Sequence, residues 1–223
     1  MLKRTLITTS LVAFMSHSLL AEESDYGKIY QGYGQGEGRG QGYGQGEGRG
    51  QGRGYGQNHQ GQSSANRAEL LSSISKGNVT DRQKEGMRYM IEEEKVARDV
   101  YLALYKKWKS HVFNNIAKAE QKHMDAVGEL FSKYNFEVPS SLKEEGKFEN
   151  AELQKLYDDL VAKGQTSLLD ALEVGVMVEE TDIADLKELL EVDILDDFKL
   201  VYDNLLKGSN RHLRSFNRQI SRQ

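Results

Sequence analysis

Apolar residues recur every three or four positions over most of the chain beyond residue 80, which is the period of an α-helix. Four long segments carry such a stripe, at about 81–108, 111–131, 168–190 and 194–216, and a shorter one covers about 151–163. No segment shows the strict alternation of apolar and polar residues that is typical of a half-buried strand. The pattern therefore predicts an all-α domain.

Capping signals and loop lengths refine this prediction. Thr80 and Gln83 have the spacing of a capping box at the start of the first helix. Further caps are expected at Ser110, at Ser167 with Asp170, and at Asp193, and Gly164 is expected as the C′ residue of the short helix. A long connection containing Pro139 separates the second and third long helices. This order fits a four-helix bundle with one long crossover connection, as in ferritin-like folds.

Polar residues interrupt the apolar stripe of each long helix on the side expected to face the core. They are Glu94 in the first helix, Glu120 and His123 in the second, Glu179 and Asp182 in the third, and His212 in the fourth. A buried carboxylate costs several kcal/mol unless it is paired or binds a cation. Several carboxylates on separate helices also repel one another, and a pair of divalent cations removes that repulsion. Glu120 and His123 lie one helical turn apart, so both can bind the same ion.

A structural interpretation of the same residues is that they form salt bridges with Lys95, Lys122 or Arg211. Neighbouring acids are interpreted as solvated or as lying behind the ligands: Glu92, Glu93 and Glu180, although a small helix rotation would exchange Glu179 and Glu180. His111, near a helix start, is expected at the surface or as a cap.

The N-terminal third of the chain has a different composition. Residues 1–21 begin with Lys3 and Arg4, continue with a mostly apolar stretch, and end at Ala21 before two glutamates, which predicts a cleaved signal peptide and an exported protein in the periplasm or outside the cell. Residues 22–65 hold 15 of the 22 glycines and repeat YGQGEGRGQG at 33–42 and 43–52. This segment is expected to be a disordered linker, or a tail that makes surface or matrix contacts. Residues 66–223 form the predicted folded domain.

Charge and cysteine content exclude several function classes. Residues 66–223 contain 24 lysines and arginines against 29 aspartates and glutamates, a net charge of −5, and no basic stripe that would favour nucleic acid. The chain has no cysteine, which excludes disulfides, thiolate metal sites and cysteine nucleophiles. After the leader, no run of 18 apolar residues remains, so we expect a protein that does not span the membrane.

Several sequence blocks resemble a known family. MIEEEKVARDVYLALY, FNNIAKAEQKHMDAV, GKFENAELQKLYDDLVAKG, SLLDALEVGVMVEETDIADL and VYDNLLKGSNRHLRSF together resemble a bacterial ferritin-like family called domain of unknown function 2202, over about residues 80–217. The resemblance implies a ferritin-like bundle with a carboxylate-bridged di-iron or di-manganese site. In that superfamily two helices each supply a Glu, and the other two each supply Glu-x-x-His.

This resemblance assigns the candidate metal ligands helix by helix. It matches Glu94 to the first helix, Glu120 and His123 to the second, Glu179 to the third and His212 to the fourth, with Tyr101 placed as in ferritins as the candidate catalytic residue. The fourth helix departs from the pattern, because Ser209 stands where a Glu is expected three residues before His212. Asp182 is a candidate for the missing oxygen ligand, and Asp203 is a less direct one. Without either, the site has five protein ligands.

Three function classes remain open at this stage. The first is a metal-dependent oxidoreductase that acts on Fe(II), O₂ or peroxide, in which Tyr101 passes an electron or donates a hydrogen bond. The second is a metal-binding or storage protein without turnover, and the third is an exported interaction module. Oxygen and nitrogen ligands favour iron or manganese, and histidine also admits zinc. The expected partners are metal ions, with a homodimer left open.

Overall fold

The structure is a computed structural model that describes residues 67–191 and 194–223. The predicted signal peptide and the repeat segment lie outside these residues, so their assignments stay predictions. Asp193 also lies outside the described residues. The described chain is all-helical and contains no strand, which confirms the predicted all-α class. Its elements are a short helix at 67–73, α3 (Asp81–Trp108), α4 (His111–Tyr134), the 3₁₀ turn η1 (Ser140–Lys143), α5 (Ala151–Gly164), α6 (Leu168–Glu191) and α7 (Asp196–Ile220).

The helix ends follow the predicted caps in part. Thr80 and Gln83 form the expected capping box at the start of α3. The hydroxyl of Ser167 accepts a hydrogen bond from the backbone N–H of Asp170 at 3.0 Å, as expected for α6. Ser110 is the N-cap residue of α4, but its side chain makes no capping hydrogen bond. The N-cap residue of α7 is Leu195 and not the predicted Asp193, so that helix begins without a side-chain cap.

Gly164 is not the left-handed C′ residue that the sequence predicted. It is the last residue of α5, and the C-cap residue Gln165 has right-handed helical dihedrals. A β-carbon on Gly164 would lie 2.6 Å from Cδ2 of Leu104. Close packing of α5 on α3, rather than backbone conformation, therefore explains this glycine.

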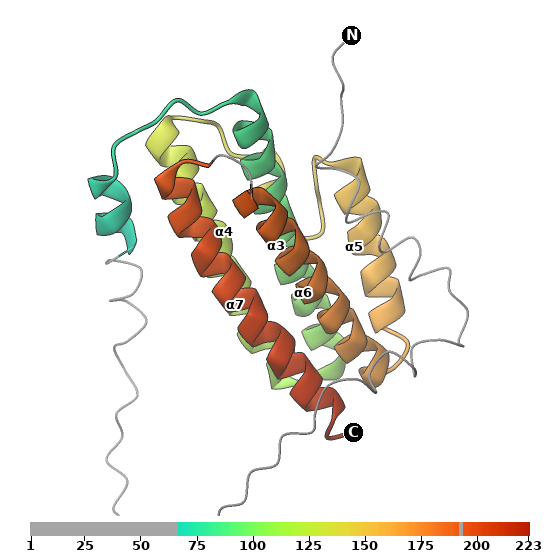
Figure 1. Ribbon diagram of the computed structural model, residues 1–223. Helices are drawn as coiled ribbons and strands as arrows, with labels where there is room; N and C mark the ends of the chain where they lie inside the picture. The colour runs from blue at the N-terminus through green and yellow to red at the C-terminus, as the bar shows by residue number, and fades with distance from the viewer. Residues whose placement is uncertain (1–66, 192–193) are drawn as a thin grey trace, which may run out of the picture.

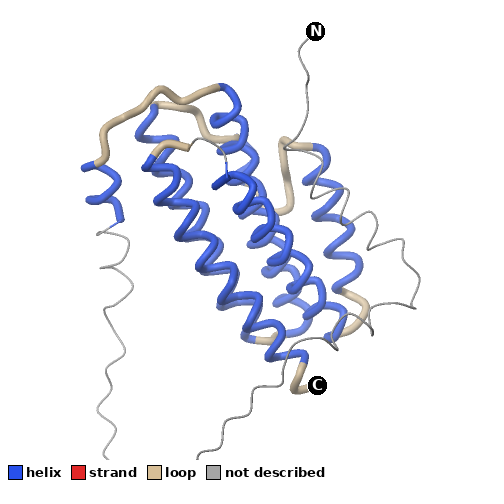
Figure 2. The backbone as a smooth tube through the Cα atoms, viewed as in Figure 1, coloured by secondary structure: helices blue, strands red, loops and turns tan. Residues whose placement is uncertain are grey.

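The helices pack as two hairpins with one additional helix. α3 lies against α4, and α6 lies against α7, while α4 also contacts α7 and α3 also contacts α6 (Figure 1). Residues 135–167 connect the two hairpins, and within this connection α5 packs against α3 and α6 (Figure 2). α3, α4, α6 and α7 thus enclose an interior, and α5 covers one side of it. No described helix is both long and apolar enough to cross a membrane.

The interior contains two separate hydrophobic clusters. One surrounds Tyr101, Phe113 and Phe216, and the other surrounds Met87 and Tyr202. In α4 the first cluster includes residues up to 117 and the second begins at 124, and in α7 the second reaches 205 and the first resumes at 216. Between the clusters lies the layer of polar side chains that forms the candidate site.

Candidate metal centre

The six ligand candidates predicted from the sequence come from four helices and occupy the layer between the two hydrophobic clusters. Three of their carboxylates, those of Glu94, Glu120 and Glu179, are each 2% exposed. The imidazoles of His123 and His212 are 13% and 12% exposed. Helical periodicity brings these groups together, since each replaces an apolar residue on the inward stripe of its helix.

Glu120 lies at the middle of the cluster. Its Oε2 atom is 2.7 Å from Nδ1 of His123, and its Oε1 atom is 2.8 Å from Nδ1 of His212. The two imidazole rings stack with their centroids 5.4 Å apart. One carboxylate therefore faces both histidines, one with each oxygen.

A further glutamate completes a three-residue group around each histidine. Oε2 of Glu94 lies 3.2 Å from Nδ1 of His123, and Oε2 of Glu179 lies 3.5 Å from Nδ1 of His212. Within each group, one ligand atom per residue lies within 4.8 Å of the others. The cluster thus consists of two oxygen- and nitrogen-bearing groups that share Glu120, which is the arrangement expected of a two-ion site with a bridging carboxylate.

Tyr101 contacts the cluster through Glu179. Its hydroxyl donates a hydrogen bond to Oε1 of Glu179 at 2.7 Å, and its ring packs on Phe216 at 5.2 Å between centroids. Burial, followed by the charge of Glu179, raises the pKa of the Tyr101 phenol well above its usual range. The hydroxyl therefore stays protonated at neutral pH and fixes the orientation of Glu179.

Asp182 lies beside the serine that replaces the expected glutamate of α7. Its carboxylate is within hydrogen-bonding reach of Ser209. Burial, followed by the charges of Glu94 and Glu179, raises the pKa of Asp182 well above its usual range. Asp203, the other candidate, forms an ion pair with Lys199 at 2.7 Å and is 37% exposed. The structure therefore brings Asp182 into the cluster and leaves Asp203 at the surface.

Electrostatics in the cluster reflect crowding of buried acids. Burial, followed by the charge of Glu120, raises the pKa of Glu179 to about 8. Burial also raises the pKa of Glu94 to about 7, although His123 acts against this shift. Burial would raise the pKa of Glu120 too, but the positive charges of His123 and His212 outweigh it and lower that pKa below its usual range. Glu120 in turn raises the pKa of His212 to about 10, against the effect of burial.

Several buried polar atoms that face the cluster make no hydrogen bond. They include one oxygen each of Glu94, Glu120 and Asp182, and Nδ1 of His212. Although Glu120 Oε1 and His212 Nδ1 are 2.8 Å apart, they are not aligned as a hydrogen bond. Leaving a buried polar atom without a partner costs about 1–3 kcal/mol. Four such atoms facing one cluster fit a site whose cations complete their interactions.

The alternative interpretation as salt bridges does not match the described residues. Within residues 67–191 and 194–223, no lysine or arginine forms an ion pair with the cluster carboxylates. Lys95 instead pairs with Asp99 at 2.6 Å, and Lys122 and Arg211 are exposed. The two histidines are thus the cationic partners that these carboxylates have.

Glu92 and Glu93 were predicted to be solvated or to lie behind the ligands, and the structure excludes the first alternative for both. Glu92 is 4% exposed, and it accepts hydrogen bonds from the Ser141 hydroxyl and from the backbone N–H groups of Glu149 and Asn150. Glu93 is 6% exposed and lies next to Asp185. Both are buried because the crossover connection and α6 cover faces of α3 that the apolar stripe did not include.

Glu180 and His111 match their predictions more closely. Glu180 is half-buried outside the cluster, whereas Glu179 points into it. The structure therefore resolves the choice between the two in favour of Glu179 facing the cluster. His111 is exposed at the first position of α4.

Gly208 is a functional candidate that the sequence did not indicate. A β-carbon at this position of α7 would lie 2.3 Å from Nε2 of His123. The available signal was a glycine inside a helical pattern, four residues before His212. It marks the place where an imidazole from α4 packs directly on the backbone of α7.

These features define the class of the molecule as an all-helical protein with a buried carboxylate–histidine cluster between four helices. Residues 83–223 match the model of a family described as "Uncharacterized protein domain (DUF2202)", and the chain belongs to this family. This match confirms the family that the sequence blocks resemble. It shows neither a ferritin-like fold nor a bacterial origin for the family.

An archaeal relative supports the family assignment. The chain is 48% identical over 153 residues to the uncharacterized protein MJ0754 of Methanocaldococcus jannaschii, a match that covers 69% of this chain and 83% of the relative. The crystal structure described as hypothetical protein MJ0754 from Methanococcus jannaschii has a TM-score of 0.66 and 47% identity, covering 67% of this chain and 86% of that one. The helical fold is therefore shared with an experimentally determined structure.

Proposed function

We propose that the described domain is a ferritin-like four-helix bundle that holds two divalent metal ions, iron or manganese, and acts as an oxidoreductase on Fe(II), O₂ or peroxide. The bundle would consist of α3, α4, α6 and α7, with α5 lying in the crossover connection. The observation that carries the proposal is the position of Glu120, whose two oxygens each face a different histidine.

Each group around a histidine would hold one ion. Glu94 and His123 would bind the first, Glu179 and His212 the second, and Glu120 would contact both. Asp182 would supply an oxygen ligand in place of the glutamate that Ser209 replaces. Oxygen ligands with one imidazole per ion suit iron and manganese, and zinc would also fit this set.

The protein's own residues would orient the ligands and exclude water. Tyr101 acts as a positioning residue, because its hydrogen bond holds Glu179 toward His212. The backbone of Gly208 leaves room for His123, and the two hydrophobic clusters isolate the polar layer from both ends. When bound, the metal pair would supply redox chemistry and a coordination site for O₂ or peroxide.

Metal stoichiometry tests this proposal. The purified protein would be loaded anaerobically with Fe(II) and analysed by elemental mass spectrometry beside His123→Ala. We expect about two irons per chain in the wild type and fewer in the variant, followed by O₂ consumption on exposure to air. Metal binding without O₂ or peroxide turnover would indicate a storage or binding protein. Absence of metal from the wild type would show that the cluster is structural.

We also propose that the protein is exported, on the basis of residues 1–21. Mass measurement of the protein recovered outside the cytoplasm would test it, with cleavage after Ala21 as the expected result. Recovery of the uncleaved chain in the cytoplasm would contradict it.

A further inference from the structure

A second pair of buried carboxylates lies beside the candidate metal centre. Glu93 of α3 and Asp185 of α6 are each 6% exposed, and their carboxyl groups lie within hydrogen-bonding reach of each other. Neither oxygen of Glu93 receives a hydrogen bond, and the same is true of Oδ2 of Asp185. Two adjacent buried acids without donors are costly to keep in a fold unless a cation or proton joins them.

Glu93, but not Asp185, lines a small cavity that also reaches two residues of the centre. Glu93, Glu94 and Asp182 all line a cavity of about 10 Å³ whose remaining walls are apolar side chains of α3, α5 and α6. That volume is close to the space that one water molecule needs. Glu93 therefore faces the same internal space as one ligand of each of α3 and α6. Its carboxylate is more than nine-tenths buried and accepts no hydrogen bond, a deficit that a bound cation would satisfy.

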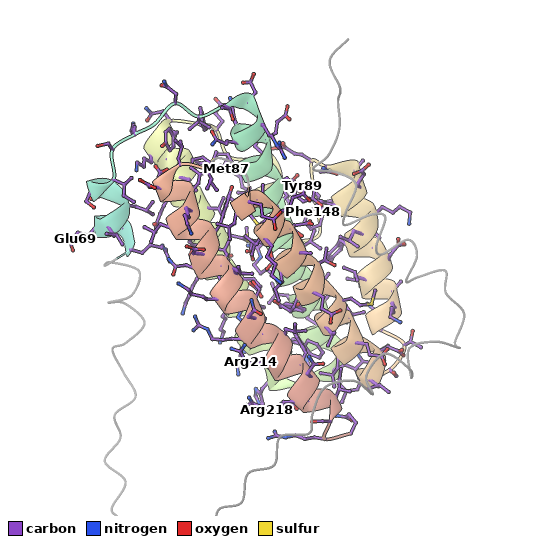
Figure 3. The ribbon with its side chains drawn as sticks, in the orientation of Figure 1. Glu69, Met87, Tyr89, Phe148, Arg214 and Arg218 are labelled. Atoms are coloured by element: carbon purple, nitrogen blue, oxygen red, sulfur yellow. The ribbon has the colours of Figure 1, made fainter. Side chains whose placement is uncertain are left out.

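Acidic residues continue from this pair toward the surface. On α6, Glu179, Asp182, Asp185 and Glu188 recur every three residues, and the first three are buried while Glu188 is half-buried. Burial raises the pKa of Asp185, and the negative charge of Glu188 raises it further. On the α5 side, Tyr89 lies near the negative charges of Glu93, Asp185 and the exposed Glu152. Burial and, after it, these charges raise the pKa of the Tyr89 phenol well above its usual range. Tyr89 belongs to α3 and Phe148 to the connection that precedes α5, and both are labelled between α3 and α5 in Figure 3.

We propose that Glu93 and Asp185 form a third cation site, which receives a divalent ion from the surface between α3, α5 and α6 and passes it to the centre. The inference rests on the proposed two-ion function. Two carboxylates and water give few ligands for a hard divalent cation, so binding at this site is weak compared with the centre. A weak site next to a stronger one suits transfer rather than storage.

Uptake kinetics of Co(II) by the metal-free protein test the proposal. Absorbance at the cobalt ligand-field bands would be followed by stopped flow in the wild type and in the Glu93→Gln/Asp185→Asn double variant. Both substitutions keep the side-chain shape and remove negative charge, so the fold is retained, which circular dichroism would verify. Glu180→Gln, a half-buried acid outside the row, is the matched control.

The expected result is at least a tenfold slower uptake in the double variant, with about two cobalt ions per chain at equilibrium and wild-type kinetics in Glu180→Gln. Uptake at the wild-type rate by the double variant would overturn the transfer site. A loss of final stoichiometry would also overturn it, because Glu93 or Asp185 would then be part of the centre. If the wild type itself bound no cobalt, the proposed two-ion function would fail, which is a distinguishable outcome.

Discussion

Nε2 of His123 faces the backbone of Gly208 so closely that a β-carbon there would be 2.3 Å away. Glycine inside a helix costs about 1 kcal/mol relative to alanine, and Gly208 occupies the middle of α7. Its absent side chain lets the imidazole lie against α7 while Nδ1 is directed at Glu94 and Glu120. This contact makes a backbone position part of the ligand geometry.

Gly208→Ala should therefore weaken metal binding. Because the new methyl group displaces the His123 ring, we expect at least a tenfold loss of affinity in Co(II) titrations, without removal of any ligand. Gly128→Ala is the control, since nothing lies within 4 Å of a β-carbon at that position. It should stabilise α4 by up to about 1 kcal/mol and leave metal binding unchanged. Equal affinity in both variants would contradict the role of Gly208.

The shared carboxylate predicts unequal effects of two similar substitutions. Glu120→Gln removes a ligand from both groups, so we expect less than one metal ion per chain by elemental analysis. Glu94→Gln affects only the group around His123 and should leave about one ion. Glu180→Gln serves as the control with two ions. Two retained ions in Glu120→Gln would show that this residue does not join the two groups.

The metal-free protein should lose stability as pH rises from 5 to 8. The folded-state pKa values of Glu94 and Glu179, about 7 and 8, lie above their unfolded value near 4.5, so the folded state binds more protons in this range and its stability falls with pH. His212 has a folded-state pKa of about 10, above its unfolded value of 6.5. Its protonated form therefore contributes stability that is fully present below pH 6.5 and is lost as pH rises toward 10.

Urea unfolding with a chelator present measures this dependence. The midpoint should decrease steadily between pH 5 and pH 8, and saturating Mn(II) should reverse the trend, because metal binding replaces the protons of these carboxyl groups. A midpoint that rises with pH in the metal-free protein would contradict the crowding of acids described here.

Tyr101→Phe tests the positioning of Glu179. Loss of the 2.7 Å hydrogen bond should destabilise the metal-free fold by about 1 kcal/mol. Two irons should still bind, while Fe(II) oxidation slows and its pH profile shifts, since this hydrogen bond also lowers the pKa of Glu179. An unchanged pH profile would mean that Tyr101 is merely part of the hydrophobic cluster.

The buried ion pair of α3 should be far more important to stability than an exposed one. Lys95→Ala removes the 2.6 Å partner of the fully buried Asp99 and leaves only Arg98, at 2.8 Å, as its cationic partner. The loss of this buried, charged hydrogen bond should cost about 2 kcal/mol or more in chemical denaturation. Lys155→Ala breaks a pair of the same i,i+4 spacing whose lysine is 76% exposed, and should cost less than about 0.5 kcal/mol. Similar losses in the two variants would contradict this difference.

Helical periodicity was sufficient to predict α3, α4, α5, α6 and α7 and the residues of the cluster, but it did not predict the short helix at 67–73. Glu94, Glu120, Glu179 and His212 each interrupt an apolar stripe, and the stripe alone shows which side of a helix faces inward. Periodicity contained no information about contacts outside the stripe. Glu92 is buried by backbone groups 57 and 58 residues away, which no local pattern reveals.

The position of α5 was equally inaccessible to local patterns. Its packing against α3 and α6 explains why Glu93 is buried and why Gly164 ends that helix in close contact with Leu104. The choice between Asp182 and Asp203 also required the relative rotation of α6 and α7. Such rotations are set by side-chain packing between helices and not by the sequence of either helix.

The central part of α3 also holds the crossover connection in place. Glu92 binds the backbone of residues 149 and 150, Lys95 donates to the carbonyl of Lys147, and Asp99 accepts from the N–H of Gly146. Glu94 belongs to the same two turns of helix. The loop contacts close chain segments of 47 to 58 residues, and such non-local contacts form slowly in folding. The polar layer between the two hydrophobic clusters should accordingly be completed late, when the crossover docks. Under the proposed function, a nascent chain would be unable to capture metal before most of its sequence has been synthesised.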